Sequence, residues 1–207
     1  IKDGNSYQIV SALDSNYCID LSAAKVANSS NIQLYSSNGT KAQRWTFSKF
    51  VSKQEKLDAL AASNKSVLAD GTYEIQSALN SNYVLDVASG SLNNGANIQL
   101  YISNSTEAQG WKVSHDEKGY VTIKNVNSGL YLSVLNGTAS NLSNIGQSNI
   151  NGYASKWIVV SQNGGYKIVS ALNTNYTIDL NGPSTKNGTN ITLYKSNGQN
   201  NQIWVFK

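Results

Sequence analysis

Residues 166–180 read Tyr-Lys-Ile-Val-Ser-Ala-Leu-Asn-Thr-Asn-Tyr-Thr-Ile-Asp-Leu, and closely similar sequences occur at 7–21 and 73–87. In each copy the aspartate is followed fifteen residues later by a tyrosine, and ten residues after that by a tryptophan. The three sets are Asp20, Tyr35 and Trp45; Asp86, Tyr101 and Trp111; and Asp179, Tyr194 and Trp204. Such self-similarity predicts a fold built from repeats.

A fourth, degenerate copy lies between the second and third. Residues 121–133 run parallel to 73–86, and Trp157 stands 46 residues after Trp111 and 47 before Trp204. The interval from Trp45 to Trp111 is 66 residues, about nineteen more than one repeat, which predicts a linker. We therefore expect an orphan repeat at 1–47 that is the third repeat of a preceding domain, a linker at 48–70 and a complete domain at 71–207, with repeats 71–114, 115–160 and 161–207.

The linker has the composition of a short helix. Ser52 and Glu55 have the spacing of a capping box, in which each side chain satisfies a free backbone amide at a helix start. Good helix formers follow over 57–62, and Asn64 is placed to end the helix in a left-handed conformation. We expect about two and a half turns of helix, with a solvated spacer as the alternative.

Elsewhere apolar and polar residues alternate with a period of two, as in Ile19-Asp20-Leu21 and Ile32-Gln33-Leu34. Short strands separated by Asn, Gly and Ser turns indicate an all-β domain. The chain contains 28 asparagines, which we expect to serve turn geometry because Asn tolerates the left-handed region. The single proline, Pro183, lies in one such turn.

Composition narrows the possible functions. No apolar stretch is long enough to span a membrane, so membrane insertion is not expected. Lys and Arg are scattered singly and the net charge is only +4, which argues against nucleic-acid binding. The chain begins at Ile1 and contains no Met, from which we expect a fragment or mature form of a longer protein.

Catalysis, metals and cofactors find little support in the sequence. Cys18 is the only cysteine, so neither an intrachain disulfide nor a CxxC metal pattern is possible. His115, the only histidine, lies in a polar segment between two repeats, where we expect a surface turn residue without catalytic partners. The repeated aspartates occupy equivalent positions of separate repeats, too far apart to act as a glycosidase pair.

The combination of Asp, Ile-Gln-Leu-Tyr and Gln-x-Trp in units of about 47 residues resembles the ricin B-type lectin family. The resemblance covers nearly all of the chain except the linker. It implies a β-trefoil, in which three repeats surround a pseudo-threefold axis and twelve strands form a six-stranded barrel closed by three hairpins. It also implies a secreted or wall-attached bacterial parent protein, with an extracellular or cell-wall location.

The degenerate repeat separates scaffold from site. It keeps its tryptophan, whereas Ser133 and Ser148 replace the aspartate and the tyrosine. We therefore assign Trp45, Trp111, Trp157 and Trp204 to the core, and the Gln of Gln-x-Trp to a structural role as well. Asp and Tyr disappear together, which favours a binding role. The alternative is that Asp caps a turn and Tyr packs at the base of a loop.

A carboxylate and an aromatic ring on neighbouring loops suit a sugar, because they accept its hydroxyl hydrogens and cover its apolar face. The resemblance places sugar contacts at three sets of residues: Asp86, Gln99, Tyr101 and Gln109; Asp179, Tyr194, Asn201 and Gln202; and Asp20, Gln33, Tyr35 and Gln43. The sets depart from the galactose-binding pattern of the family, which often has Asn where this chain has Ala42 and Ala108. Thr192 replaces the family's Gln in the last repeat.

These features predict a non-catalytic carbohydrate-binding module without cofactors or metals, binding glycans weakly at several linked sites. Galactose and N-acetylated sugars are both candidate ligands. The alternative function is a structural spacer or protein-interaction domain of a tandem array. Residues 1–47 are closest in sequence to the last repeat and cannot close a barrel alone. We expect them to pack on the complete domain or to self-associate, with three such repeats rebuilding a trefoil.

Overall fold

The computed structural model describes residues 1–182 and 184–207, and the predicted turn at Pro183 therefore lies outside the described residues. The chain forms two compact units, Ile1–Val51 and Ser52–Lys207. The second unit begins at Ser52 and thus includes most of the segment predicted as a linker.

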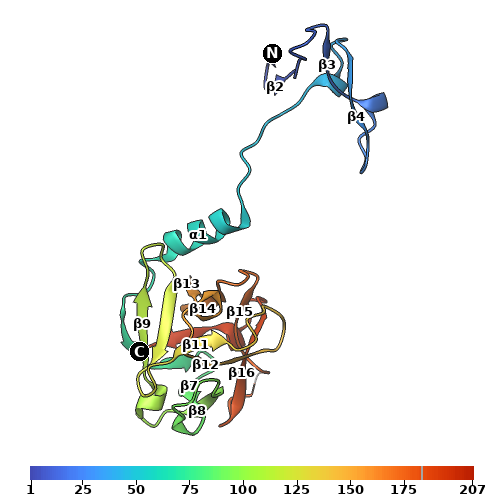
Figure 1. Cartoon of the computed structure of the whole chain (residues 1–207). Coiled ribbons are helices and arrows are strands. Elements are labelled where there is room, and N and C mark those ends of the chain that lie inside the picture. Colours follow the sequence, from blue (N-terminus) through green and yellow to red (C-terminus); the bar gives the residue numbers. More distant parts are fainter. Residues whose placement is uncertain (183) are drawn as a thin grey trace. The chain divides into compact units, whose positions relative to one another are not determined.

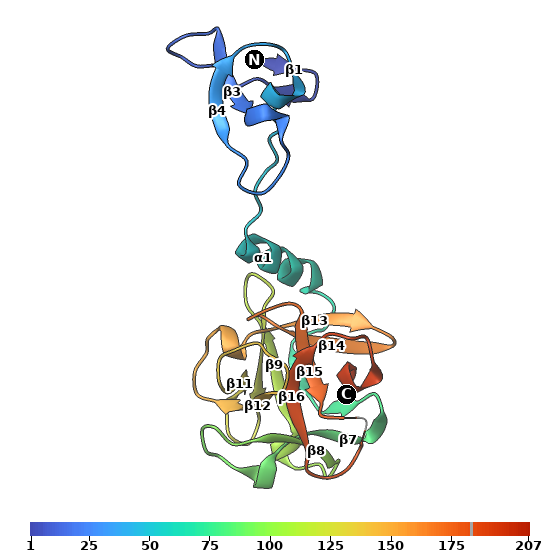
Figure 2. The same ribbon diagram turned by 90° about the vertical axis from the view of Figure 1, so that its right-hand side faces the viewer.

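The first unit consists of two short antiparallel pairs. Strand β1 (Lys2–Asp3) pairs with β2 (Ser6–Tyr7), and β3 (Tyr17–Leu21) pairs with β4 (Ile32–Ser36), as Figure 2 shows for β3 and β4. Short 3-10 turns follow at η1 (Ser22–Ala24) and η2 (Lys41–Gln43). A bridge between Tyr7 and Trp45 joins the two ends of the unit. This is the strand pattern of one repeat.

The second unit is a β-trefoil, as predicted (Figure 1). Its strands are β5 (Gly71–Tyr73), β6 (Ile75–Ser77), β7 (Asn80–Val87), β8 (Ile98–Ile102), β9 (Trp111–His115), β10 (Val121–Asn125), β11 (Tyr131–Val134), β12 (Ser143–Ser148), β13 (Trp157–Gln162), β14 (Gly165–Ser170), β15 (Tyr176–Leu180), β16 (Thr189–Lys195) and β17 (Trp204–Phe206). Pairings β6–β17, β17–β14, β14–β13, β13–β10, β10–β9 and β9–β5 close the barrel. The three hairpins are β7–β8, β11–β12 and β15–β16.

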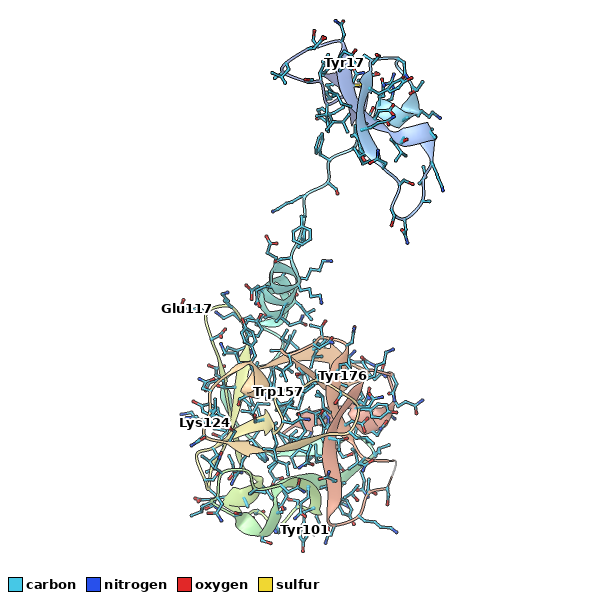
Figure 3. The ribbon with its side chains drawn as sticks, turned by 45° about the vertical axis from the view of Figure 1, so that its right-hand side comes forward. Tyr17, Tyr101, Glu117, Lys124, Trp157 and Tyr176 are labelled. Carbon is cyan, nitrogen blue, oxygen red and sulfur yellow. The ribbon has the colours of Figure 1, made fainter. Side chains whose placement is uncertain are left out.

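The tryptophans of this unit form its core. Trp111, Trp157 and Trp204 are fully buried, and Figure 3 shows Trp157 in the interior. Each indole Nε1–H donates to a backbone carbonyl in its own repeat: Leu85 at 3.0 Å, Leu132 at 3.0 Å and Ile178 at 3.3 Å, respectively. These bonds satisfy the one polar atom of each buried ring. The scaffold prediction is confirmed for these three residues, whereas Trp45 in the first unit is only half-buried.

The second strands of the hairpins, β8, β12 and β16, contact one another at the pseudo-threefold axis, where three asparagines form a closed ring. Asn97 Nδ2 donates to Asn190 Oδ1 at 2.9 Å, Asn190 Nδ2 to Asn144 Oδ1 at 2.8 Å, and Asn144 Nδ2 to Asn97 Oδ1 at 2.9 Å. Because every amide donates once and accepts once within the ring, the polar groups at the axis satisfy one another.

Asparagines do serve turns, as expected, but the expected reason, a left-handed backbone, holds for only one of the described asparagines. Among described non-glycine residues with positive φ, Asn163 is the one asparagine, beside alanines, serines and a leucine. The asparagine side chains instead accept local backbone N–H groups, as Asn104 Oδ1 does from Thr106 N at 3.1 Å. The physical reason is that a side-chain oxygen can close a turn without a left-handed backbone.

Helix α1 (Lys53–Asn64) begins as predicted and ends differently. The capping box is confirmed, since Ser52 Oγ accepts from Glu55 N at 3.0 Å and Glu55 Oε2 accepts from Ser52 N at 2.7 Å. Asn64 is not a left-handed cap: it stays helical, and its side chain donates to Leu60 O at 2.9 Å. The helix runs for 12 residues, about a turn longer than expected.

Helix α1 packs against the trefoil, next to β13 and β14 (Figures 1 and 2). Its Ala61 is buried in a cluster with Tyr120, Ile158, Val169 and Ala171. Asp58 Oδ1 accepts from the Tyr120 hydroxyl at 2.6 Å, and Asp58 Oδ2 lies 2.9 Å from Lys118 Nζ. The hydrogen bonds from Tyr120, Lys118 and Gln54 lower the pKa of Asp58 to about 2. The helix is therefore an integral part of the second unit and not a solvated spacer.

His115 is not the surface turn residue that the sequence suggested. It ends strand β9, its side chain is only 7% exposed, and its Nδ1 lies 2.5 Å from Asp70 Oδ1. The backbone N–H of His115 donates to the same oxygen at 3.0 Å. Contact with His115 lowers the pKa of Asp70. The pair joins the start of the first trefoil repeat to its last strand, which is a structural role.

Candidate functional site

The first trefoil repeat holds Asp86 at the end of strand β7, opposite Gln99 on β8. The residue before it, Leu85, is fully buried, and its carbonyl receives the Trp111 indole hydrogen bond. The tryptophan of each repeat thus fixes the peptide that precedes the site aspartate. This explains why the spacing from aspartate to tryptophan is constant in the three complete copies.

Two glutamine amides hold the Asp86 carboxylate. Gln99 Nε2 donates to Oδ1 at 2.8 Å, and Gln109 Nε2 donates to Oδ2 at 3.1 Å. Burial raises the pKa of Asp86 above its ordinary value, although these two hydrogen bonds act in the opposite direction. Asp86 as a residue is only 6% exposed, so little of it faces solvent. It is a rigid acceptor with a fixed orientation.

Gln109 supports Asp86 from behind. It is fully buried, and its amide also donates to Ile102 O at 3.0 Å and accepts from Asn104 N at 2.8 Å. Gln202 is bound in the same way in the third repeat, to Lys195 O, Asn197 N and Asp179. Neither glutamine has surface left for a ligand. Their place in the site is to orient the aspartates.

An open hollow lies over Asp86. It is lined by Asp86, Gln99, Tyr101, Ser89, Gly90, the segment 104–108 and Asn127. Tyr101 is half-buried, and Figure 3 shows it at the outer edge of the trefoil. The structure therefore brings together three of the four residues predicted for this repeat on one concave surface, with Gln109 behind them.

Asn127 is a contributor that the sequence did not reveal, because it belongs to the next repeat. Its Nδ2 donates to Gly90 O at 3.0 Å, which ties the rim of the hollow to the second repeat. Ser89 on the same rim has a φ of +57°, a strained value for a serine. The spacing of motifs in the sequence gave no indication that Ser89 would adopt this left-handed backbone conformation.

The third repeat builds a related but different acceptor. Asp179 Oδ2 accepts from both Asn201 Nδ2 at 2.8 Å and Gln202 Nε2 at 2.9 Å. Thr192 occupies the position of Gln99 opposite the aspartate, and its buried Oγ1 has no partner among the described residues. Burial raises the pKa of Asp179, and the Gln202 hydrogen bond opposes this. Asp179 keeps Oδ1 free of amide donors within the described residues.

The surroundings of Asp179 differ as well. A hollow in this repeat is lined by Asn201, Leu79 and the segment 198–200. Tyr194 is half-buried on β16, opposite Thr177 of β15. Asp179, Asn201 and Gln202 are therefore brought together by direct contacts, whereas Tyr194 makes no hydrogen bond to them in the described part of the chain.

The remaining two copies show the limits of the pattern. In the first unit, Gln33 Nε2 donates to Asp20 Oδ1 at 3.0 Å and Tyr35 is exposed, whereas Gln43 bonds Ser36 O and Asn38 N instead of the aspartate. In the degenerate repeat, Ser155 Oγ donates to Ser133 Oγ at 3.1 Å. The hollow beside Ser133 is lined by aliphatic side chains together with serines and asparagines, and has no carboxylate in its lining.

The described residues contain no group of three or more His, Cys, Asp or Glu side chains placed to hold a metal ion. No helix among them is long and apolar enough to cross a membrane. The first and third trefoil repeats each offer a buried carboxylate held by side-chain amides, and that of the first repeat, Asp86, lines an open hollow. Its chemistry is acceptance of hydrogen bonds from ligand hydroxyl or amide groups.

Comparison with known proteins agrees with this arrangement, which is that of a trefoil binding module. The ricin-type beta-trefoil lectin domain-like family matches over residues 1–101, 61–148, 107–194 and 153–207. The chain belongs to this family, as the sequence resemblance predicted. No curated protein matches the sequence.

Several solved structures are similar to this chain. The designed 3-fold symmetric protein ThreeFoil has 29% identity and a TM-score of 0.63, covering 66% of this chain and 98% of its own. The Rhizoctonia solani agglutinin has 29% identity and a TM-score of 0.63, with 67% and 95% covered. The Macrolepiota procera ricin B-like lectin, solved with lactose, has 24% identity and a TM-score of 0.58, with 69% and 98% covered. The last of these supports the fold alone.

Proposed function

We propose that the second unit is a non-catalytic carbohydrate-binding module with sites in its first and third repeats. The observation that carries this proposal is the amide-held carboxylate, built around Asp86 and Asp179 and absent from the described lining of the degenerate repeat. If the aspartate served only to cap a turn, all three repeats would need it. The degenerate repeat nevertheless keeps the same strands and its buried tryptophan.

The chemistry of the first-repeat site suits a sugar. Hydroxyl groups donate to the part of Asp86 that faces solvent, while the two glutamine amides hold the carboxylate in place and so reduce the entropy lost on binding. Tyr101 offers an aromatic surface in the same hollow for the apolar face of a pyranose. Each hydrogen bond to a charged acceptor contributes about 1.5–3 kcal/mol. A single open site of this kind binds weakly.

Useful strength then comes from several sites on one chain, because linked sites raise the effective concentration of the second binding event. We include the Asp20, Gln33 and Tyr35 set of the first unit among the candidate sites. Galactose-containing and N-acetylated glycans are the proposed ligands. We propose an extracellular or cell-wall setting, where such glycans are accessible.

A glycan array followed by titration calorimetry tests the proposal. Asp86→Ala and Asp179→Ala should each remove one site, with affinity there falling by at least about 10-fold, and the pair should abolish binding to the second unit. Ser133→Ala is the matched control at the same position of the degenerate repeat and should leave binding unchanged. Absence of binding to any glycan, or full binding by the paired variant, would favour the alternative of a structural spacer or protein-interaction domain.

A further inference from the structure

The hollow over Asp86 carries a second carboxylate, that of Glu107, and its described lining contains no lysine or arginine. Glu107 is the first residue of the 3-10 turn η4 (Glu107–Gln109), which leads directly into the glutamine behind Asp86. The ion pairs formed among the described residues include neither Asp86 nor Glu107. The hollow is therefore negatively charged, and no described side chain in its lining compensates this charge.

The fold does not use the Glu107 carboxylate. The hydrogen bonds that Glu107 accepts from described residues go to its backbone carbonyl, from Gly110 N at 3.1 Å and from Asn125 Nδ2 at 3.4 Å. The side chain is exposed on the rim of the hollow. Its charge is therefore available to a ligand that lies there.

The position of Glu107, two residues before the Gln of Gln-x-Trp, carries a different charge in each complete copy. It is Lys41 in the first unit and Asn200 in the third trefoil repeat. All three residues are exposed and begin a 3-10 turn, η2, η4 and η6 (Asn200–Gln202). The same local backbone thus accepts a cation, an anion or a neutral amide, so the structure of the turn does not require a carboxylate. The third-repeat hollow, lined by Asn200 and Asn201, has no carboxylate in its described lining.

Asp86 is a buried negative charge that is held by neutral groups, the side-chain amides of Gln99 and Gln109. A buried charge is costly unless an opposite charge accompanies it. Because Asp86 and Glu107 line the same hollow, a cationic group of a bound ligand approaches both carboxylates. An ammonium group brings one positive charge and three hydrogen-bond donors.

We propose that the first-repeat site takes glycans that carry a protonated primary amino group, namely hexosamines whose nitrogen is not acetylated, and that Glu107 selects this charge. This ligand class rests on the proposed carbohydrate-binding function and specifies one of its sites. The ammonium group donates to Asp86 and is attracted by Glu107, while Tyr101 covers the apolar face of the sugar ring. The third-repeat site, with Asn200 in place of Glu107, keeps the neutral galactose-containing and N-acetylated glycans.

Titration calorimetry of the 207-residue chain tests this ligand class with glucosamine and galactosamine oligosaccharides, each in its free-amine and its N-acetylated form. Asp20→Ala and Asp179→Ala in the background remove the other two candidate carboxylates. At about pH 6 an amine of ordinary pKa is protonated. The free-amine form of the preferred sugar should then bind at least about 10-fold more tightly than its acetylated form, because the hydrogen bond to Asp86 joins two charged groups.

Variants at Glu107 separate charge selection from binding as such. Glu107→Asn copies the third repeat and should lower the preference for the free amine by about 2- to 5-fold, as expected for an exposed ion pair. Glu107→Lys copies Lys41 of the first unit and should lower it by about 10-fold or more, because repulsion replaces attraction. Glu117→Lys is the matched control: Glu117 is also exposed and lies at the other end of the trefoil from Tyr101 (Figure 3). It should leave the preference unchanged.

The results distinguish charge selection from carbohydrate binding. Equal affinities for the free and acetylated forms, or a preference that Glu107→Lys does not reduce, would overturn the selection by Glu107 and leave carbohydrate binding in place. A preference that Glu117→Lys lowers as much as Glu107→Lys would show that the net charge of the chain attracts the amine, which would also overturn it. Absence of binding to every glycan would overturn both proposals.

Discussion

Replacing Asp179 by Asn separates a binding carboxylate from a structural one. Asp179 Oδ2 accepts from Asn201 Nδ2 and Gln202 Nε2, and an asparagine carbonyl can accept the same two bonds while its Nδ2 takes the place of Oδ1. The substitution therefore keeps the local hydrogen bonds and removes only the charge. Two quantities should respond differently, namely the affinity for the glycan and the free energy of unfolding.

The affinity at the third-repeat site should fall by about 10- to 150-fold, the equivalent of about 1.5–3 kcal/mol for one hydrogen bond to a charged acceptor. Titration calorimetry in an Asp86→Ala background isolates this site from the first-repeat site. The free energy of unfolding at pH 7 should stay within about 1 kcal/mol of the parent or rise.

The sign of the stability change follows from the pKa. Burial raises the folded-state pKa of Asp179 above its unfolded value of 3.8. The protonated carboxyl therefore contributes stability that is fully present below about pH 4 and is lost as the pH rises through the folded pKa. Because asparagine does not titrate, the free energy of unfolding of Asp179→Asn should rise relative to that of the parent at pH 7, and this difference should disappear at pH 3. Urea denaturation followed by tryptophan fluorescence at both pH values measures this.

Asp86→Asn is the informative comparison. Both Asp86 oxygens accept from glutamine amides, and Gln109 is held in its orientation by Ile102 O and Asn104 N. In Asp86→Asn the side-chain NH₂ replaces the oxygen that accepts from Gln99 Nε2, so two donors would face each other. The Gln99 side-chain amide must then flip so that its oxygen accepts from the new NH₂. We expect Asp86→Asn to be less stable than Asp179→Asn. Unchanged glycan affinity, or a loss of more than about 2 kcal/mol of stability in Asp179→Asn, would show that the reasoning is wrong and that the carboxylate is structural.

Two further predictions concern helix α1 and its contacts. The pKa of Asp58 is about 2 in the folded state against an ordinary 3.8. The charged Asp58 carboxylate therefore stabilises the docking of the helix above about pH 4, and this contribution is lost as the pH falls through about 2. Amide hydrogen exchange in α1 should become faster over this pH window in the parent and vary less with pH in Asp58→Asn. Gly119→Ala would place a Cβ 2.5 Å from Ala61 O at a φ of +93°, whereas Gly137→Ala has a φ of +63° and nothing within 4 Å. Gly119→Ala should therefore cost more stability in urea denaturation, by at least about 1 kcal/mol, and equal costs would contradict the close helix contact.

Local and periodic features were predictable. The capping box at Ser52 and Glu55 depends on side chains three residues apart, and the structure has it as expected. The burial of Trp111 and Trp157 followed from their persistence in a degenerate repeat, since packing positions are retained where site residues are lost. The end of α1 was not predictable, because its contact with the trefoil extends the helix beyond what propensity indicates.

Contacts between segments far apart in the sequence could not be predicted from the spacing of motifs. His115 meets Asp70, forty-five residues away, and was therefore mistaken for a turn residue. Asn127 reaches the hollow of the preceding repeat, and its position within its own repeat gave no sign of this. The asparagines read as turn formers include the ring at the axis, which exists only when three repeats converge.

The sequence by itself determined the repeat, its period, the trefoil and the candidate carboxylates at Asp86 and Asp179, because these depend on residue types at fixed separations along the chain. The tertiary structure decided how each carboxylate is held and which glutamine is buried behind it. Those properties depend on distances between segments far apart in sequence, and burial and hydrogen bonding are set by what surrounds a side chain and not by its place in a motif.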